Sequence, residues 1–126
     1  MTDVKDLMTV DPARLDPEAK IEDAWKVMHS ERVRHVPVCK GDRLVGIVTQ
    51  KDLLVNAQNT SLLSLPVAEI MVFDVHTVEK DMPAAAAARL MVDEKISCLP
   101  VVEDGNLVGI VTDSDFLNLV IELLAR

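Results

Sequence analysis

Apolar and polar residues along this chain form the same order of patterns twice. Short apolar runs bounded by turn residues predict strands at residues 36–39 and 44–48, and again at residues 99–102 and 107–111. The residues between the strands of each pair include glycine and aspartate, and those of the second pair also include asparagine, all of which are typical of hairpin turns. Each pair is therefore predicted to form a β-hairpin.

A helix is predicted before and after each hairpin. Residues 21–28 place apolar side chains, Trp25 among them, at helical spacing, which gives one core-facing stripe. In the second copy Pro83 suits the first helical position, and the alanines after it favour helix. Further helices are expected at residues 50–57 and 113–125, and the last has an apolar stripe too wide for a helix that faces only solvent.

The remaining segments are predicted from composition and position. Residues 13–15 and 76–78 are candidate short strands that lead into the first helix of each copy. The short amphipathic turns at residues 1–9 and 67–72 are expected to cross the edge of their own unit. Residues 56–66 are interpreted as a linker.

The two copies are related by one constant offset. Many pairs of identical residues are separated by 63 positions without a gap, among them Gly46 and Gly109, Pro37 and Pro100, Met28 and Met91, and Asp52 and Asp115. The chain is therefore a tandem duplication, with repeat 1 at residues 1–58, a linker at residues 59–66 and repeat 2 at residues 67–126, expected to form one compact module. The fold class is predicted to be mixed α/β (α+β), with a small sheet packed on two helices in each repeat. Gly46 and Gly109 are expected where another backbone segment approaches their strand closely.

Composition limits the function classes. With 126 residues, of which 49% are hydrophobic, the chain can bury the core of one compact domain. No apolar run is long enough to span a membrane and residues 1–16 are too polar for a signal peptide, so a cytoplasmic location is expected. The net charge of −8 argues against binding to nucleic acid or to an anionic membrane. Cys39 and Cys98 are expected to be reduced, packed thiols.

One motif in both copies carries the candidate chemistry. The sequence Leu-Val-Gly-Ile-Val-Thr is identical in the two copies, and its threonines, Thr49 and Thr112, are followed three residues later by Asp52 and Asp115. This spacing predicts a threonine and an aspartate that together cap the first turn of a helix. Such a helix start can also receive a phosphate on its free N–H groups, while the aspartate holds sugar hydroxyls. Capping alone and ligand binding are both open at this point.

The order of elements, the Val-Pro-Val and Leu-Pro-Val sequences of the hairpins and the duplicated Leu-Val-Gly-Ile-Val-Thr-x-x-Asp resemble the cystathionine β-synthase (CBS) domain pair. The resemblance covers essentially the whole chain. It implies two β-α-β-β-α units related by pseudo-two-fold symmetry, and a non-catalytic regulatory module that signals to a partner. It further implies clefts between the repeats that bind adenosine-type ligands, such as AMP, ADP, ATP or S-adenosylmethionine. The residues it assigns to these sites are Thr49, Asp52, Thr112, Ser114, Asp115, Val10, Ala13, Val33, Arg34, His35, Val72, His76 and Ile96.

The resemblance also implies a role for each kind of residue. The threonines face phosphate, the aspartates accept hydrogen bonds from ribose hydroxyls, and adenine lies against backbone and apolar side chains. The motif of each repeat is expected to work with the base pocket of the other: Thr112 and Asp115 with Ala13 and Val33, and Thr49 and Asp52 with His76 and Ile96.

The two repeats differ in charge beside these motifs. Arg34 and His35 precede the proline-containing strand of repeat 1, where repeat 2 has a serine and a cysteine. These two basic residues either donate charge-assisted hydrogen bonds to a phosphate or lie on a solvated rim. The two clefts are therefore expected to differ in affinity. No metal site is predicted, because the three histidines have no partners at ligand spacing.

An enzyme is not expected, because the chain lacks the glycine-rich loops and nucleophile motifs of catalytic families. No cofactor is predicted apart from the regulatory ligand. The expected partners are that ligand, an unidentified regulated protein and a second copy of the chain in a homodimer, since the last helix is too apolar for solvent. The alternative is a ligand-free module that dimerises or docks on a partner through this helix.

Overall fold

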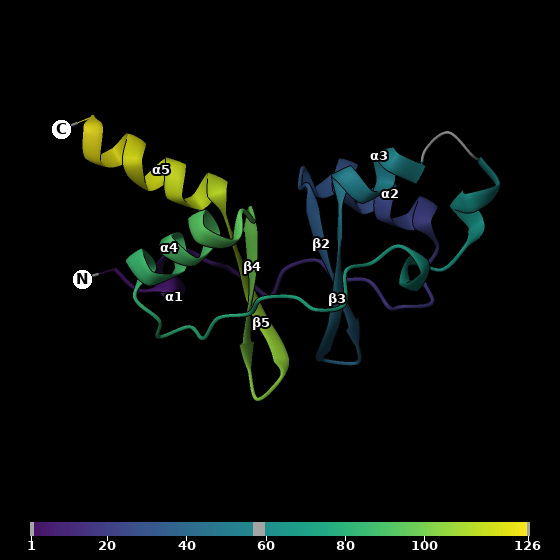
Figure 1. The fold of residues 1–126 in the computed structure, drawn as a ribbon, viewed down its shortest axis with the longest axis horizontal. Coiled ribbons are helices and arrows are strands. Elements are labelled where there is room, and N and C mark those ends of the chain that lie inside the picture. Colours follow the sequence, from purple (N-terminus) through teal and green to yellow (C-terminus); the bar gives the residue numbers. More distant parts are fainter. Residues whose placement is uncertain (1, 57–59, 126) are drawn as a thin grey trace. The chain divides into compact units, whose positions relative to one another are not determined.

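The computed structural model describes residues 2–56 and 60–125, and the chain folds into two compact units (Figure 1). The terminal unit consists of residues 1–11 together with residues 76–126, and the central unit consists of residues 12–75. Each unit contains one of the two predicted hairpins, and we describe each by itself.

The central unit is built on the β2–β3 hairpin. The two strands are antiparallel, and their register pairs Pro37 with Ile47. Leu15 forms a parallel bridge to Val38 of β2, and Val72 forms an antiparallel bridge to Ile47 of β3. The elements of this unit are α2 (Ile21–Glu31), β2 (His35–Lys40), β3 (Arg43–Thr49), α3 (Gln50–Asn56) and the 3₁₀ helices η1 (Thr60–Ser64) and η2 (Val67–Glu69).

Helix α2 packs on the core of the central unit through the predicted stripe. Ile21, Ala24 and Met28 are buried, and Trp25 is partly buried against the same core. The helix is followed by its C-cap residue, Arg32, which has left-handed backbone angles (φ 55°) and donates its N–H to the Met28 carbonyl. A left-handed residue at this position closes the helix by satisfying one of its last free carbonyl groups.

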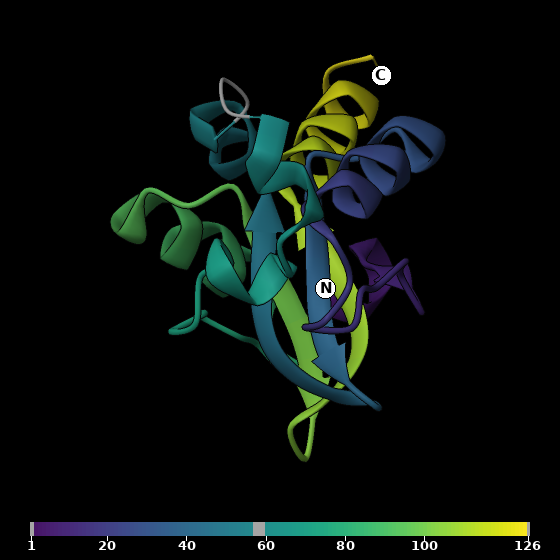
Figure 2. The same cartoon turned by 90° about the vertical axis from the view of Figure 1, so that its right-hand side faces the viewer.

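The terminal unit has the same architecture, built from both ends of the chain. Strand β5 pairs antiparallel with both β4 and β1, and Val78 forms a parallel bridge to Val101. In a second view, α5 continues directly from the end of β5 (Figure 2). The elements of this unit are α1 (Val4–Leu7), β1 (Thr9–Val10), α4 (Ala84–Glu94), β4 (Cys98–Glu103), β5 (Asn106–Thr112) and α5 (Asp113–Leu124).

The opening segment of each repeat lies in the unit built on the other repeat's hairpin. Thr9 of repeat 1 pairs with Ile110 in the terminal unit, and the equivalent Val72 of repeat 2 pairs with Ile47 in the central unit. The crossing that was predicted for residues 1–9 and 67–72 is therefore confirmed as a reciprocal exchange.

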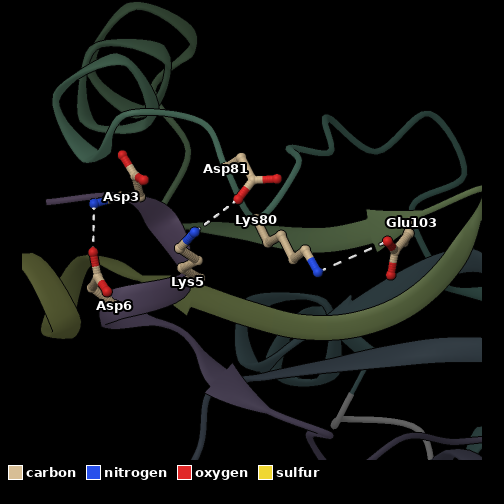
Figure 3. A network of polar contacts seen from close by, with 6 residues as sticks. All are labelled: Asp3, Lys5, Asp6, Lys80, Asp81 and Glu103. Atoms are coloured by element: carbon tan, nitrogen blue, oxygen red, sulfur yellow. Dashed lines mark hydrogen bonds and ion pairs between the residues drawn. The ribbon is translucent and has the colours of Figure 1, made fainter.

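Burial holds the N-terminal segment in the terminal unit, and polar contacts add to it (Figure 3). Val4 is fully buried in the core of this unit. Lys5 Nζ lies 3.0 Å from Asp81 Oδ1, and the Asp3 N–H donates to Asp6 Oδ2 at 2.8 Å across the first turn of α1. The Lys5–Asp81 ion pair raises the Lys5 pKa and lowers the Asp81 pKa through their hydrogen bond, but both side chains are exposed and screened by solvent. The burial of Val4 therefore contributes more to holding this segment in place than the exposed Lys5–Asp81 ion pair does.

The predicted hairpins and main helices are confirmed, and the differences fall at segment ends. Pro83 is the N-cap of α4 rather than its first residue. In the candidate strands at residues 13–15 and 76–78, only Leu15 and Val78 form strand bridges. In the predicted linker, Thr60–Ser64 form η1 and pack near α2 within the central unit, and residues 57–59 lie outside the described residues.

Both strand glycines lie where a second backbone segment approaches, as the sequence predicted. A Cβ atom on Gly46 would lie 2.8 Å from the carbonyl oxygen of Val72, and one on Gly109 would lie 3.0 Å from that of Thr9. These distances are shorter than ordinary van der Waals contacts. Glycine therefore permits the exchanged segments to pair with β3 and β5.

Candidate functional site

The first Thr-x-x-Asp motif closes the turn between β3 and α3. Asp52 Oδ2 accepts hydrogen bonds from the Thr49 N–H at 3.1 Å and from the Thr49 hydroxyl at 2.8 Å, and the Asp52 N–H lies 3.3 Å from Thr49 Oγ1. The capping interpretation is confirmed for this motif. Because these bonds use Oδ2, the second carboxylate oxygen, Oδ1, is left to accept from another donor.

The second motif has the same geometry at the start of α5. Asp115 Oδ2 accepts from the Thr112 N–H at 2.8 Å and from the Thr112 hydroxyl at 3.4 Å, and the pair forms a capping box. Thr112 and Asp115 are half-buried, as are Thr49 and Asp52. Both motifs thus hold one aspartate in a fixed position at a helix start, and each aspartate keeps acceptor capacity.

The charge around the two motifs differs. Gln50 and Lys51 separate Thr49 from Asp52, whereas Asp113 and Ser114 separate Thr112 from Asp115. The turn at the start of α5 therefore holds two carboxylates, those of Asp113 and Asp115. The Ser114 N–H donates to Asp113 Oδ1 at 2.8 Å. An anion near the terminal-unit motif would meet two carboxylates, whereas at the central-unit motif it would meet one carboxylate and the lysine Lys51.

Two apolar residues assigned to base pockets are exposed at strand pairings. Val10 of β1 is 68% exposed and Val72, which pairs with Ile47, is 44% exposed. Phe73, next to Val72, is 68% exposed. Exposed large apolar side chains of this kind offer area for a planar ring to cover.

The structure brings Val33 and Arg34 together in a hollow of about 380 Å³ at the C-terminal end of α2. The Val33 N–H bonds to the Met28 carbonyl at 3.1 Å, and the Arg34 carbonyl accepts from the Gln50 N–H at 2.8 Å. These bonds fix the connection between α2 and β2 against the start of α3. The hollow is lined by Trp25, Met28, His29, Arg32, Val33, Arg34 and Gln50.

The other assigned residues are distributed over both units. His35, the first residue of β2, pairs with Thr49 of β3, so these two assigned residues are neighbours across the hairpin. In the terminal unit His76 Nε2 lies 3.6 Å from Glu94 Oε2, and Ile96 is partly buried. Ala13 is exposed in the central unit. The cooperation expected between the motif of one repeat and the base pocket of the other stays a prediction.

Apart from the buried Met28, the residues of the hollow that were not singled out from the sequence as site residues are Trp25, His29, Arg32 and Gln50. A signal was present, because the equivalent positions of repeat 2 carry alanine, valine, lysine and aspartate. Trp25 was interpreted as a core residue, and it does pack on the core with part of its surface. A comparison of the two repeats along the whole of α2 would have shown that these positions differ, but not that they line one hollow.

The buried thiols do not provide a nucleophile. Cys39 and Cys98 are free and buried, as predicted. Burial raises the pKa of the Cys98 thiol to about 12, and burial likewise raises the pKa of Cys39. Residues 2–56 and 60–125 contain no group of three or more His, Cys, Asp and Glu placed to hold a metal ion. Across the same ranges, no helix has the length and apolar character needed to cross a membrane.

The duplicated hairpins, their capped Thr-x-x-Asp turns and the exchanged opening segments define a tandem pair of small α/β domains. A sequence profile of the CBS domain matches residues 4–58 and again residues 67–122. The chain therefore belongs to the CBS domain family, and the resemblance seen in the sequence is confirmed.

Known proteins resemble the chain in sequence and in structure. Inosine-5′-monophosphate dehydrogenase of Korarchaeum cryptofilum is 39% identical over 113 residues, which cover 89% of this chain and 22% of the enzyme. The crystal structure of AcuB from Vibrio cholerae has a TM-score of 0.89 at 40% identity and covers 99% of this chain and 94% of that one. The CBS domain pair of protein MJ0100, in complex with 5′-methylthioadenosine and S-adenosyl-L-methionine, has a TM-score of 0.88 at 31% identity, with 97% and 98% covered. The chain thus spans about a quarter of the length of the curated relatives that it matches first.

Proposed function

We propose that this CBS domain pair is a non-catalytic regulatory module that binds adenosine-type ligands and signals to a partner protein. The observation that carries the proposal is the duplicated Thr-x-x-Asp turn, in which each aspartate is held in place and retains a free acceptor. The CBS pair of MJ0100, which is similar over nearly its whole length, was solved with two adenosine compounds.

In this proposal each motif supplies the polar half of a site. The threonine and the N–H groups of the helix start receive a phosphate or another polar group at the ligand's 5′ position. The aspartate accepts from the ribose hydroxyls, and the exposed Val10 and Val72 contribute to the surfaces that adenine covers. Arg34 and His35 act on the phosphate side of the site at the Thr49 and Asp52 motif, where they add positive charge.

The charge difference between the motifs assigns a preference to each. Lys51 near Asp52 favours a phosphorylated ligand, such as AMP or ATP, at the central-unit motif. Asp113 and Asp115 disfavour phosphate at the terminal-unit motif, which suits a neutral or cationic adenosine compound such as S-adenosylmethionine.

Thermal unfolding with AMP, ADP, ATP and S-adenosylmethionine tests the proposal. A ligand that binds only the folded chain at a hundredfold excess over its Kd adds about 2.7 kcal/mol of stability. For a domain of this size, that corresponds to a rise in Tm on the order of 10 °C. We expect a rise with at least one of the four compounds and none with guanosine, which serves as the control.

The variants Asp52→Asn and Asp115→Asn assign the response to a motif. Each replaces one carboxylate oxygen by a donor, while the remaining amide oxygen can still accept from the threonine N–H. We expect Asp52→Asn to reduce the response to AMP and Asp115→Asn to reduce the response to S-adenosylmethionine. Full responses in both variants would contradict the assignment of ribose to these aspartates.

A further inference from the structure

Two methionines at equivalent positions of the repeats lie against the strand glycines. The Sδ atom of Met8 lies 2.7 Å from where a Cβ atom on Gly109 would be, and the Sδ atom of Met71 lies 2.7 Å from the same point on Gly46. Each sulfur therefore fills the space that the glycine leaves open, beside the place where an exchanged segment meets β5 or β3. Each methionine also packs on the core of the unit that contains this strand.

The methionines of the described residues differ in their access to solvent. Met8 and Met82 are partly exposed. The buried ones are Met28, Met71 and Met91. A dissolved oxidant reaches an exposed sulfur more readily than a buried one. Of the two sulfurs that lie over a strand glycine, that of Met8 is therefore the one that an oxidant reaches first.

The space around the Met8 sulfur suits an apolar thioether and not a polar sulfoxide. Outside Met8 itself, the atom nearest to the Cβ position of Gly109 is the carbonyl oxygen of Thr9, at 3.0 Å. This oxygen accepts hydrogen bonds, as a sulfoxide oxygen does, so the two cannot bond to each other. Burial of an unpaired acceptor is unfavourable. An oxidised Met8 is therefore expected to leave the gap, and the core of the terminal unit loses the packing of its side chain.

Met8 lies where the loss of its packing acts on β1. It is the C-cap residue of α1 and directly precedes β1 in the chain. Strand β1 forms two residue pairs with β5, Thr9 with Ile110 and Val10 with Gly109. A strand this short has few contacts of its own, and segments with few buried apolar contacts open at low cost in free energy. Displacement of Met8 is therefore expected to weaken the pairing of β1 with β5.

We propose that Met8 is a reversible oxidation site that controls the docking of β1 on β5. The oxidant is hydrogen peroxide: its O–O bond breaks, an S–O bond forms at Met8 Sδ, the sulfur gives up two electrons and water leaves. Methionine sulfoxide reductases return the sulfoxide to the thioether, so the change can be reversed. Because Val10 of β1 is assigned to an adenine surface, oxidation also weakens ligand binding at the Thr112 and Asp115 motif, and this last step rests on the proposed function.

Treatment of the chain with hydrogen peroxide, followed by peptide mass spectrometry and thermal unfolding, tests the proposal. We expect Met8 to gain one oxygen atom before Met71 does, and the Tm to fall by roughly 5–10 °C as side-chain packing is lost. Reduction by methionine sulfoxide reductases is expected to restore the Tm. Hydrogen exchange is expected to become faster at Asp11, whose N–H donates to the Val108 carbonyl at 3.2 Å. Oxidation of Met71 ahead of Met8, or an unchanged Tm after oxidation of Met8, would overturn the proposal.

The variants Met8→Leu and Met82→Leu assign the effect to one sulfur. Leucine is apolar and close to methionine in volume, so both variants are expected to keep the fold. Met8→Leu is expected to keep its Tm under peroxide, whereas Met82→Leu, the matched control at the other partly exposed methionine, is expected to lose as much as the native chain. An equal loss of Tm in Met8→Leu would overturn the proposal. Met1 lies outside the described residues, and mass spectrometry measures its oxidation separately.

Isothermal titration calorimetry separates this oxidation site from the proposed regulatory function. The chain oxidised at Met8 is expected to bind S-adenosylmethionine roughly tenfold more weakly, because the apolar surface of Val10 is displaced, and to bind AMP as the reduced chain does. Equal binding of S-adenosylmethionine before and after oxidation would overturn the control of the ligand site. If the reduced chain binds neither compound, the proposed function fails, and the Tm and hydrogen exchange still decide whether Met8 controls the docking of β1.

Discussion

At the scale of single residues, Gly109 shows how one missing side chain permits the exchange of segments. A Cβ atom there would lie 2.7 Å from Met8 Sδ and 3.0 Å from the carbonyl oxygen of Thr9. The methionine side chain can rotate away, but the Thr9 carbonyl belongs to the strand that pairs with β5. The backbone contact is therefore the one that forbids a larger residue.

We predict that Gly109→Ala lowers the free energy of unfolding by about 1–3 kcal/mol, because the added methyl group overpacks the β1–β5 contact. Urea denaturation measures this change. Gly46→Ala, with a Cβ 2.8 Å from the Val72 carbonyl oxygen, is expected to have an effect of similar size in the central unit. Wild-type stability in both variants would contradict the close approach of the Val72 and Thr9 backbone to these two glycines.

The sequence was sufficient to predict the residues whose role depends on local spacing. Thr49 and Asp52 are three positions apart in one helical turn, so their hydrogen bonds follow from the spacing alone. The position of Arg32 in the lining of the hollow could not be predicted in this way. It depends on how α2 ends and on where the start of α3 lies, which are set by packing between segments that are distant in sequence.

At the scale of elements, α1 depends on tertiary contacts for its stability. It has four residues, too few to be stable as an isolated helix, and Val4 is its fully buried residue. The same holds for η2, in which Val67 is fully buried in the central unit. Each exchanged segment is thus held by one fully buried valine, by apolar neighbours that pack on the same core, such as Met8 and Met71, and by backbone hydrogen bonds.

We predict that Val4→Ala destabilises the terminal unit by about 2 kcal/mol, because it removes buried methyl groups and leaves a cavity. Hydrogen exchange measures where the loss occurs. Amides of residues 76–125 are expected to exchange faster while those of residues 35–49 change less, and Val67→Ala is expected to show the reverse. Faster exchange in residues 35–49 alone after Val4→Ala would contradict the exchange of segments.

The hairpins and long helices could be predicted because each is defined by periodicity within its own segment. The pairings of Thr9 with Ile110 and of Val78 with Val101 could not, because two-residue strands and single bridges have no periodicity of their own. The η1 helix was interpreted as linker for a related reason. Its polar composition resembles a loop, and Leu63 packs on the central core only because α2 lies nearby.

At the scale of the whole molecule, α5 carries an exposed apolar stripe. Leu117, Val120, Ile121 and Leu124 are all exposed and follow helical spacing. An apolar stripe of this width is typical of an interaction surface. We propose that a second copy of the chain covers it, because two-fold association is the commonest closed arrangement.

We predict that the chain sediments as a dimer rather than as a 13.9 kDa monomer, and that Ile121→Asp shifts it to monomer by placing a charge in the stripe. Asn118→Asp adds the same charge to α5 outside the stripe and is expected to leave the dimer intact. A native chain that sediments as a monomer at high micromolar concentration would contradict the homodimer.

Direct binding of adenosine ligands is the measurement that tests the central claim, and isothermal titration calorimetry with AMP and with S-adenosylmethionine provides it. We expect saturable binding of both by the native chain, weaker AMP binding by Asp52→Asn and weaker S-adenosylmethionine binding by Asp115→Asn. The purified chain is denatured, and the absorbance of the released material is measured at the wavelength where adenine absorbs. This measurement checks for adenosine ligand that was already bound. No heat of binding with either compound at millimolar concentration, in a chain free of copurified nucleotide, would contradict the account and favour a ligand-free interaction module.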